Sequence, residues 1–172
     1  MDKLHTCCFI GHGYDNLSLS GLTENDIYFK IQKHVKNAVN DGYLNFICGA
    51  ELGADLLFCE AVINEKKQHN INLVCVLSSS QQSASWHHEA REQFANILDA
   101  ANSVICLNEK NIKGCTAKRN QYIIDLSSYL ITAYNGSKGQ TDLAIKYAKK
   151  SGLKFNNILD IIKDDDSGQI SF

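Results

Sequence analysis

Six short apolar runs recur along the chain, and each is separated from the next by a segment with the apolar spacing of a helix. The runs are rich in β-branched and aromatic residues, which favour strands. They are Leu4–Ile10, Leu44–Cys48, Ile71–Leu77, Ser103–Leu107, Tyr129–Tyr134 and Lys154–Leu159. This rhythm predicts a repeated β-α unit.

The intervening segments carry apolar stripes at every third or fourth position, as one face of a helix does. The stripes are Ile27, Ile31, Val35, Ala38 and Val39; Phe94, Ile97, Leu98 and Ala101; and Ala144, Ile145 and Ala148. The strand runs are nearly continuous in apolar character, as a parallel sheet covered by helices on both faces requires. We therefore predict an α/β fold, a Rossmann-like three-layer sandwich with a mostly parallel sheet of about six strands.

The length of 172 residues suits one core, so residues 1–160 are expected to form a single domain. Residues 161–172 are charged and contain glycine, and this C-terminal tail is expected to fray. No run approaches the roughly 18 apolar residues of a membrane span, and the N-terminus lacks a signal-peptide pattern. A cytoplasmic location away from membranes is the default expectation.

Charge and cysteine content narrow the class of ligand. A formal net charge of -2 argues against a dedicated nucleic-acid binder, which normally needs a basic excess. The seven cysteines are an odd number and include no CxxC pair. Most lie in strand-like runs, which indicates reduced thiols in the core: Cys7, Cys8, Cys48, Cys75 and Cys106. We predict no metal site and no cofactor.

Two glycine-rich junctions follow strands, where open α/β sheets bind their ligands. After the first run, Gly11-His12-Gly13 allows close backbone approach and offers an imidazole, although a simple tight turn explains the glycines equally well. After the fifth run, residues 135–141 offer N–H groups and hydroxyls that would cradle a phosphate. Neither the P-loop ending nor GxGxxG is present.

A third junction follows the second strand. Gly49 and Gly53 bracket the start of a helix whose free N–H groups favour an anion. Glu51 and Asp55 add negative charge there, either to bind ribose hydroxyls or only to cap the helix. Glu60 shares a helical face with apolar residues, and we expect it to form an internal hydrogen bond.

The remaining strand ends carry aromatic and basic side chains. Trp86 and Arg91 follow the third strand, where the indole would stack on a base or, alternatively, anchor the helix start against the protein. Arg119 and Asn120 stand at the beginning of the next helix, with a solvated basic face as the alternative.

Several segments occur in an order that resembles the YpsA-like family of the SLOG (Smf/DprA/LOG) superfamily. They are FIGHG, GAELGAD, a Gln-then-Trp loop, KRNQYIIDLSSYLITAYNG and GQTDLAIKYAKKSG, which span residues 8 to about 158. The resemblance implies a Rossmann-type nucleotide-ligand binder. Superfamily members act as ligand sensors, as DNA-handling proteins or as phosphoribohydrolases.

The chain departs from that family at three positions. The usual GHR reads Gly11-His12-Gly13, so a phosphate-binding arginine is missing. The usual GGT reads Gly139-Gln140-Thr141. Where the phosphoribohydrolase motif PGGxGTxxE has its catalytic glutamate, this chain has Ala144, which supplies no titratable group. These departures disfavour an enzyme of that type.

The leading hypothesis is a non-catalytic binder of a nucleotide-derived small molecule, ADP-ribose-like or cyclic, that acts as a sensor or as a sponge for immune second messengers. A homo-oligomer is expected. One alternative is an N-glycosidic-bond hydrolase or transferase that uses Glu51, Asp55 and Arg119. Another is a regulatory scaffold for a cell-division or DNA-processing protein. The predicted ligand-binding residues are Gly11, His12, Gly13, Gly49, Ala50, Glu51, Gly53, Asp55, Ser79, Gln81, Trp86, Arg91, Arg119, Asn120, Asn135, Gly136, Ser137, Gly139, Gln140 and Thr141.

Overall fold

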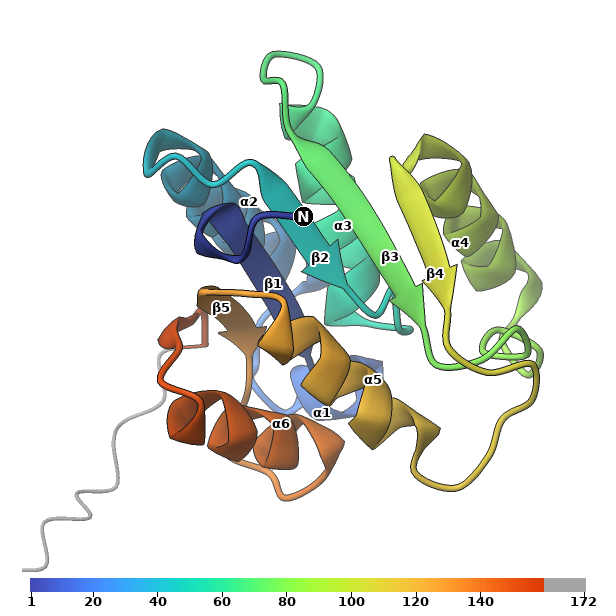
Figure 1. The fold of residues 1–172 in the computed structure, drawn as a ribbon. Coiled ribbons are helices and arrows are strands. Elements are labelled where there is room, and N and C mark those ends of the chain that lie inside the picture. The colour runs from blue at the N-terminus through green and yellow to red at the C-terminus, as the bar shows by residue number, and fades with distance from the viewer. Residues whose placement is uncertain (160–172) are drawn as a thin grey trace, which may run out of the picture.

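The computed structural model describes residues 1–159, and the predicted tail at residues 161–172 lies outside them. The sheet has six strands, all parallel, in the order β4-β3-β2-β1-β5-β6 (Figure 1). Its strands are β1 (Thr6–Gly11), β2 (Asn45–Cys48), β3 (Asn72–Leu77), β4 (Ser103–Cys106), β5 (Tyr129–Ala133) and β6 (Lys154–Asn157). The helices are α1 (Tyr14–Ser18), α2 (Glu24–Asn40), α3 (Ala54–Glu65), α4 (His88–Ala100), α5 (Cys115–Asp125) and α6 (Gln140–Lys150), preceded by a 3-10 turn at Lys3–His5. The predicted Rossmann-like α/β fold is confirmed.

Helices cover both faces of the sheet, as the continuous apolar strands predicted. Helices α2, α3 and α4 lie on one face, while α5 and α6 lie on the other (Figure 1). The predicted stripes are the buried faces of these helices, with Ile31 and Val35 of α2 fully buried. Adjacent strand residues enter opposite cores, so that Cys7 packs with the first group of helices and Cys8 with the second.

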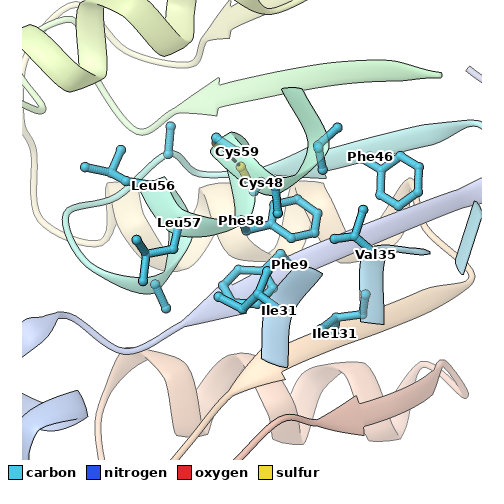
Figure 2. Packing of buried hydrophobic residues seen from close by; sticks show 14 of the residues in the cluster. Phe9, Ile31, Val35, Phe46, Cys48, Leu56, Leu57, Phe58, Cys59 and Ile131 are labelled. Carbon is cyan, nitrogen blue, oxygen red and sulfur yellow. Dashed lines mark hydrogen bonds between the residues drawn. The ribbon is translucent and has the colours of Figure 1, made fainter. Parts of the chain in front are cut away.

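The core under α2, α3 and α4 is built around three phenylalanines (Figure 2). The ring of Phe58 on α3 stacks on Phe9 of β1, with the ring centroids 4.7 Å apart. Its other neighbour is Phe46 of β2, with a centroid distance of 6.3 Å. These contacts fix α3 over the centre of the sheet, which places its N-terminus beside the end of β1.

The two edge strands depart from the continuous burial that the sequence predicted. Within residues 1–159, strand β4 has no neighbour beyond β3, and most of its residues are exposed, Cys106 included. Cys106 is therefore not a core thiol, and that prediction is wrong. Strand β6, at the other edge, is also largely exposed. An edge strand has a partner on one side only and receives less cover from the helices.

The strand order creates a switch point in the middle of the sheet. The chain runs outward from β1 through β2 and β3 to β4, and then returns through α5 to place β5 on the other side of β1. The backbone N–H of His12 donates to the carbonyl of Ala133 at 3.0 Å, so the loops after β1 and β5 start side by side. Ligands of open α/β sheets bind at such a point.

Within residues 1–159, no helix is long and apolar enough to cross a membrane.

Candidate functional site

His12 lies at the switch point, directly after β1. Its side chain is buried, with 4% of its surface exposed, and its Nε2 atom has no hydrogen-bond partner among residues 1–159. Burial lowers the pKa of His12, and the amide of Asn135 partly offsets this effect. The centroid of the Tyr134 ring lies 5.4 Å from that of the imidazole. The site therefore holds a neutral imidazole with one nitrogen left for a ligand.

The N-terminus of α6 faces the same switch point. Its N-cap residue is Gly139, and no side chain of residues 1–159 caps the N–H groups of the first turn. The Thr141 hydroxyl donates to the carbonyl of Gly11 at 3.2 Å, so it joins α6 to β1 and is used by the fold. Uncapped N–H groups at a helix start attract an anion.

The loop that precedes α6 is fastened at Asn135. The side-chain nitrogen of Asn135 donates to the carbonyl of Asn16 at 2.8 Å, and its oxygen accepts from the N–H of Ser137 at 3.0 Å. Gly136, Gly139 and Gln140 remain exposed around it. The loop is thus held at one residue while its glycines stay open to solvent.

The start of α3 is closed by the loop after β1. The N–H of Ala54 donates to the carbonyl of His12 at 3.1 Å, and a Cβ atom on Gly53 would lie 2.6 Å from the Cα of Gly13. Gly53 also has a φ of 118°, which L side chains rarely adopt. The Ala54 N–H is therefore not free for an anion, which leaves α6 as the better anion site.

Asp55 joins the end of β1 and the loop after β2 to the start of α3. Its carboxyl accepts from the N–H of Gly11 at 3.0 Å and from the N–H of Glu51 at 3.4 Å. Burial raises the pKa of Asp55 to about 8, while Arg119 opposes that shift. Asp55 lies in the first turn of α3 but bonds to the ends of other segments, so it does more than cap its own helix.

Arg119 is buried, not part of a solvated basic face. Its Nη1 atom lies 3.0 Å from the Glu51 carboxylate and donates to the carbonyl of Gly49 at 3.3 Å. Its Nε atom donates to Asn120 at 3.1 Å. A Cβ atom on Gly49 would lie 2.4 Å from the guanidinium, so this glycine makes room for the arginine. Because α5 begins at Cys115, Arg119 lies about one turn inside the helix, not at its beginning.

Gln82 completes this network, and sequence reasoning missed it. Its amide nitrogen donates to the carbonyls of Gly49 and Ala50 at 2.9 and 3.1 Å, and its oxygen accepts from the Ser78 N–H at 2.9 Å. The neighbouring Gln81, which was predicted instead, is exposed. Nothing in a Gln-Gln pair shows which side chain turns inward, so no local signal distinguishes them.

The other residues predicted after β3 lie apart from the switch point between β1 and β5. Trp86 packs its ring edge-on against Phe94, with centroids 5.1 Å apart, as the anchoring alternative described. Arg91 is exposed on α4. Ser79 is fully buried, and its hydroxyl has no partner in the part of the chain that the structure describes.

A groove of about 570 Å³ lies on the outer side of α2, α3 and α4, away from the strand ends. Glu60 lines it and accepts a hydrogen bond from Gln93 at 2.8 Å, which confirms the predicted internal bond. The carboxyl ends of the strands, where His12 and α6 meet, are a different region.

Two curated proteins are similar to this chain. It is 29% identical to the SPbeta prophage-derived protein YoqJ of Bacillus subtilis, over 63% of this chain and 71% of YoqJ. It is 26% identical to the UPF0398 protein BH1768 of Halalkalibacterium halodurans, over 69% of this chain and 65% of that protein. The chain therefore spans a little under two thirds of the second relative.

The solved structures that are similar to this chain include that of DNA processing protein A from Helicobacter pylori, described for its single-stranded DNA binding mode. The match has a TM-score of 0.59 and 18% identity, and covers 87% of this chain and 63% of that one. At this identity the likeness shows the fold alone. The YpsA family model, described as the YspA SLOG family, matches residues 13–167, so the chain belongs to the YpsA family of SLOG proteins.

Proposed function

We propose that this protein binds a nucleotide-derived small molecule, ADP-ribose-like or cyclic, at the switch point between β1 and β5. Membership of the SLOG family supports a nucleotide-related role. The observation that carries the proposal is the unpartnered, buried Nε2 of His12 beside the uncapped start of α6. A buried polar atom normally has a partner, and a ligand would supply one here.

The two features suit different parts of such a ligand. The N–H groups at the start of α6 would hold a phosphate, because the helix dipole favours negative charge there. The His12 imidazole, neutral near pH 7, would bond to a ring or ribose atom of the ligand. Gly13 and Gly136 leave the backbone open for close approach.

Main-chain groups would supply most of the phosphate binding. Arg119, the arginine closest to the loop after β2, is already engaged. Its guanidinium contacts the carboxylate of Glu51, the carbonyl of Gly49 and the amide oxygen of Gln82. Family members with GHR would add an arginine at the position of Gly13. Without this cation we expect only moderate affinity for the phosphates. Contacts to the rest of the ligand would then supply a larger share of the binding free energy.

Binding without turnover fits the side chains around the site. Ala144 is buried in the core under α5 and α6, so no carboxylate occupies the position of the phosphoribohydrolase glutamate. Glu51 and Asp55, the alternative acids, are engaged by Arg119 and by backbone N–H groups. The role is that of a sensor or a sequestering protein, and the prophage origin of YoqJ favours the second.

The test is calorimetric titration of the purified protein with ADP-ribose, a cyclic dinucleotide and a single-stranded oligonucleotide. The oligonucleotide is included because of the DNA binding that is named for the Helicobacter pylori protein. His12→Ala should weaken binding of the small nucleotide at least about tenfold, since it removes one buried hydrogen bond. The matched control is His88→Ala, at an exposed histidine of α4, which should bind as the wild type does.

A second measurement separates binding from turnover. After long incubation the complex is denatured and the released ligand is identified by mass. Recovery of the intact nucleotide supports the proposal, whereas a cleaved base or ribose phosphate would favour the hydrolase alternative. Binding of the oligonucleotide alone, or equal affinity in both histidine variants, would refute the switch-point site.

A further inference from the structure

Three cysteines from three segments meet in the core beneath the loop after β2. Cys48 ends β2 and is the register partner of Cys75 on β3, so both side chains project from the same face of the sheet. Cys59 lies on α3, which packs against this face of the sheet. All three are fully buried, and their Sγ atoms lie within 4.8 Å of one another. The Cys48 and Cys59 side chains point toward each other (Figure 2). Their Sγ atoms are 3.1 Å apart.

The composition of this cluster selects a class of ion. Thiolates are soft ligands, which prefer Cu(I), Zn(II) and iron-sulfur clusters. Zn(II) in structural sites takes four ligands, whereas this group in the described residues consists of three thiols. Full burial leaves no solvent-exposed side from which water would complete a fourth position. Three sulfurs without a fourth donor suit a Cu(I) ion better than Zn(II).

We propose that Cys48, Cys59 and Cys75 form a buried site for Cu(I), held by sulfur atoms alone. Binding exchanges thiol protons for the ion: the S–H bond of each ligand that deprotonates is broken, a Cu–S bond forms, and the proton passes to solvent. No electron is transferred, because copper enters and remains as Cu(I).

Deprotonation of one ligand would leave one thiolate and one monovalent cation without net charge, which limits the cost of burying the ion. The three cysteines are not among the residues at which we propose nucleotide binding, so the copper site does not rest on the function proposed above.

The experiment uses the full chain with Cys106→Ser, which removes the exposed thiol and leaves the cluster intact. Because the three sulfurs are buried, the protein is refolded without oxygen in the presence of Cu(I), and bathocuproine disulfonate then competes for the metal. One copper ion per chain should survive the competition. X-ray absorption should show sulfur ligands only.

Variants assign the ion to the cluster. Cys75→Ser should lower the affinity for Cu(I) at least about a hundredfold, since loss of even an outer-shell partner costs about 10-fold to 100-fold. Cys7→Ser is the matched control, at a cysteine of β1 that is equally buried and enters the same core. Cys7→Ser should retain copper as the parent does.

Three results would overturn the proposal: complete removal of copper by the competitor, nitrogen or oxygen ligands in the absorption spectrum, or equal copper retention in the Cys75→Ser and Cys7→Ser variants. If Cys75→Ser does not fold, Cys59→Ala on α3 takes its place, because alanine suits a helix. The competition and the absorption spectrum of the parent chain decide the question even without either variant.

Discussion

At the scale of single residues, the candidate site depends on polar groups in unusual surroundings. His12 has a buried nitrogen without a partner in residues 1–159, while Asp55 and Arg119 are buried with theirs. Each of these side chains costs free energy to bury unless it is bonded. Asp55 offers the clearest measurable consequence, because its pKa is raised to about 8.

Asp55 should make the stability of the protein decrease with rising pH. Its folded pKa lies above the unfolded value of 3.8, so the folded state holds a proton that the unfolded state has lost between about pH 4 and pH 8. The contribution of Asp55 to the free energy of unfolding is therefore greatest below pH 4. It decreases by at most about 1.4 kcal/mol per pH unit and is lost as the pH rises through 8. The substitution Asp55→Asn should remove this pH dependence.

Urea unfolding at several pH values checks that prediction. The free energy of unfolding of the wild type should fall relative to Asp55→Asn as the pH increases. Asp99→Asn, at an exposed aspartate of α4, should follow the wild type. Parallel curves for the wild type and Asp55→Asn would show that Asp55 is ionised in the folded protein.

At the scale of elements, the helices differ in how the N–H groups of their first turns are satisfied. Helix α2 begins with a capping box, in which Thr23 accepts from the N–H of Asp26 at 3.1 Å and Asp26 accepts from the N–H of Thr23 at 2.9 Å. Helix α6 has no such cap. Helices α1, α3 and α5 also begin without a side-chain cap, and at α3 the first N–H is satisfied by the His12 carbonyl. The start of α6 is the uncapped one that lies where we propose the ligand.

Loss of the α2 cap should destabilise the whole domain. Thr23→Ala should lower the free energy of unfolding by about 1 kcal/mol, because the Asp26 N–H loses its acceptor, the Asp26 carboxylate loses the Thr23 hydroxyl, and α2 carries buried core residues. Denaturant unfolding measures the change. Asn25→Ala, at an exposed position in the same first turn, should differ from the wild type by less than about 0.5 kcal/mol. Equal effects of the two variants would contradict the role of the cap.

At the scale of the molecule, the strand order brings together the loops at which we propose that a ligand binds. The return of the chain from β4 to β5 places the loops after β1 and β5 together, whereas the groove along α2, α3 and α4 lies on the outer surface. The buried side-chain atoms of His12 and Ser79 that have no partner within residues 1–159 lie instead at the carboxyl ends of β1 and β3.

Hydrogen exchange should distinguish the two regions. Saturating ADP-ribose should slow amide exchange at residues 12–13 and 136–141, because a bound phosphate engages the N–H groups at the start of α6. Amides of α3 and α4 that line the groove should exchange at the same rate with and without the nucleotide. Protection confined to α3 and α4 would move the binding site to the groove.

Local patterns were enough to predict the elements of this protein. Apolar runs located the strands to within about two residues, and helical stripes identified the buried faces, because burial leaves a periodic mark on each segment by itself. The glycine-rich strand ends were likewise visible, since tight turns and close approaches require glycine. The sequence singled out His12 and residues 135–141 in this way, and the structure places the starts of these two loops side by side.

Only the tertiary structure decided which of these segments are neighbours. The order of the strands, the burial of Arg119 and the inward turn of Gln82 each depend on contacts between segments far apart in sequence. The same holds for Cys48, Cys59 and Cys75, which show no metal-binding spacing in the sequence and meet only when α3 packs on β2 and β3. Periodicity records whether a side chain is buried, but the crossovers determine what it is buried against.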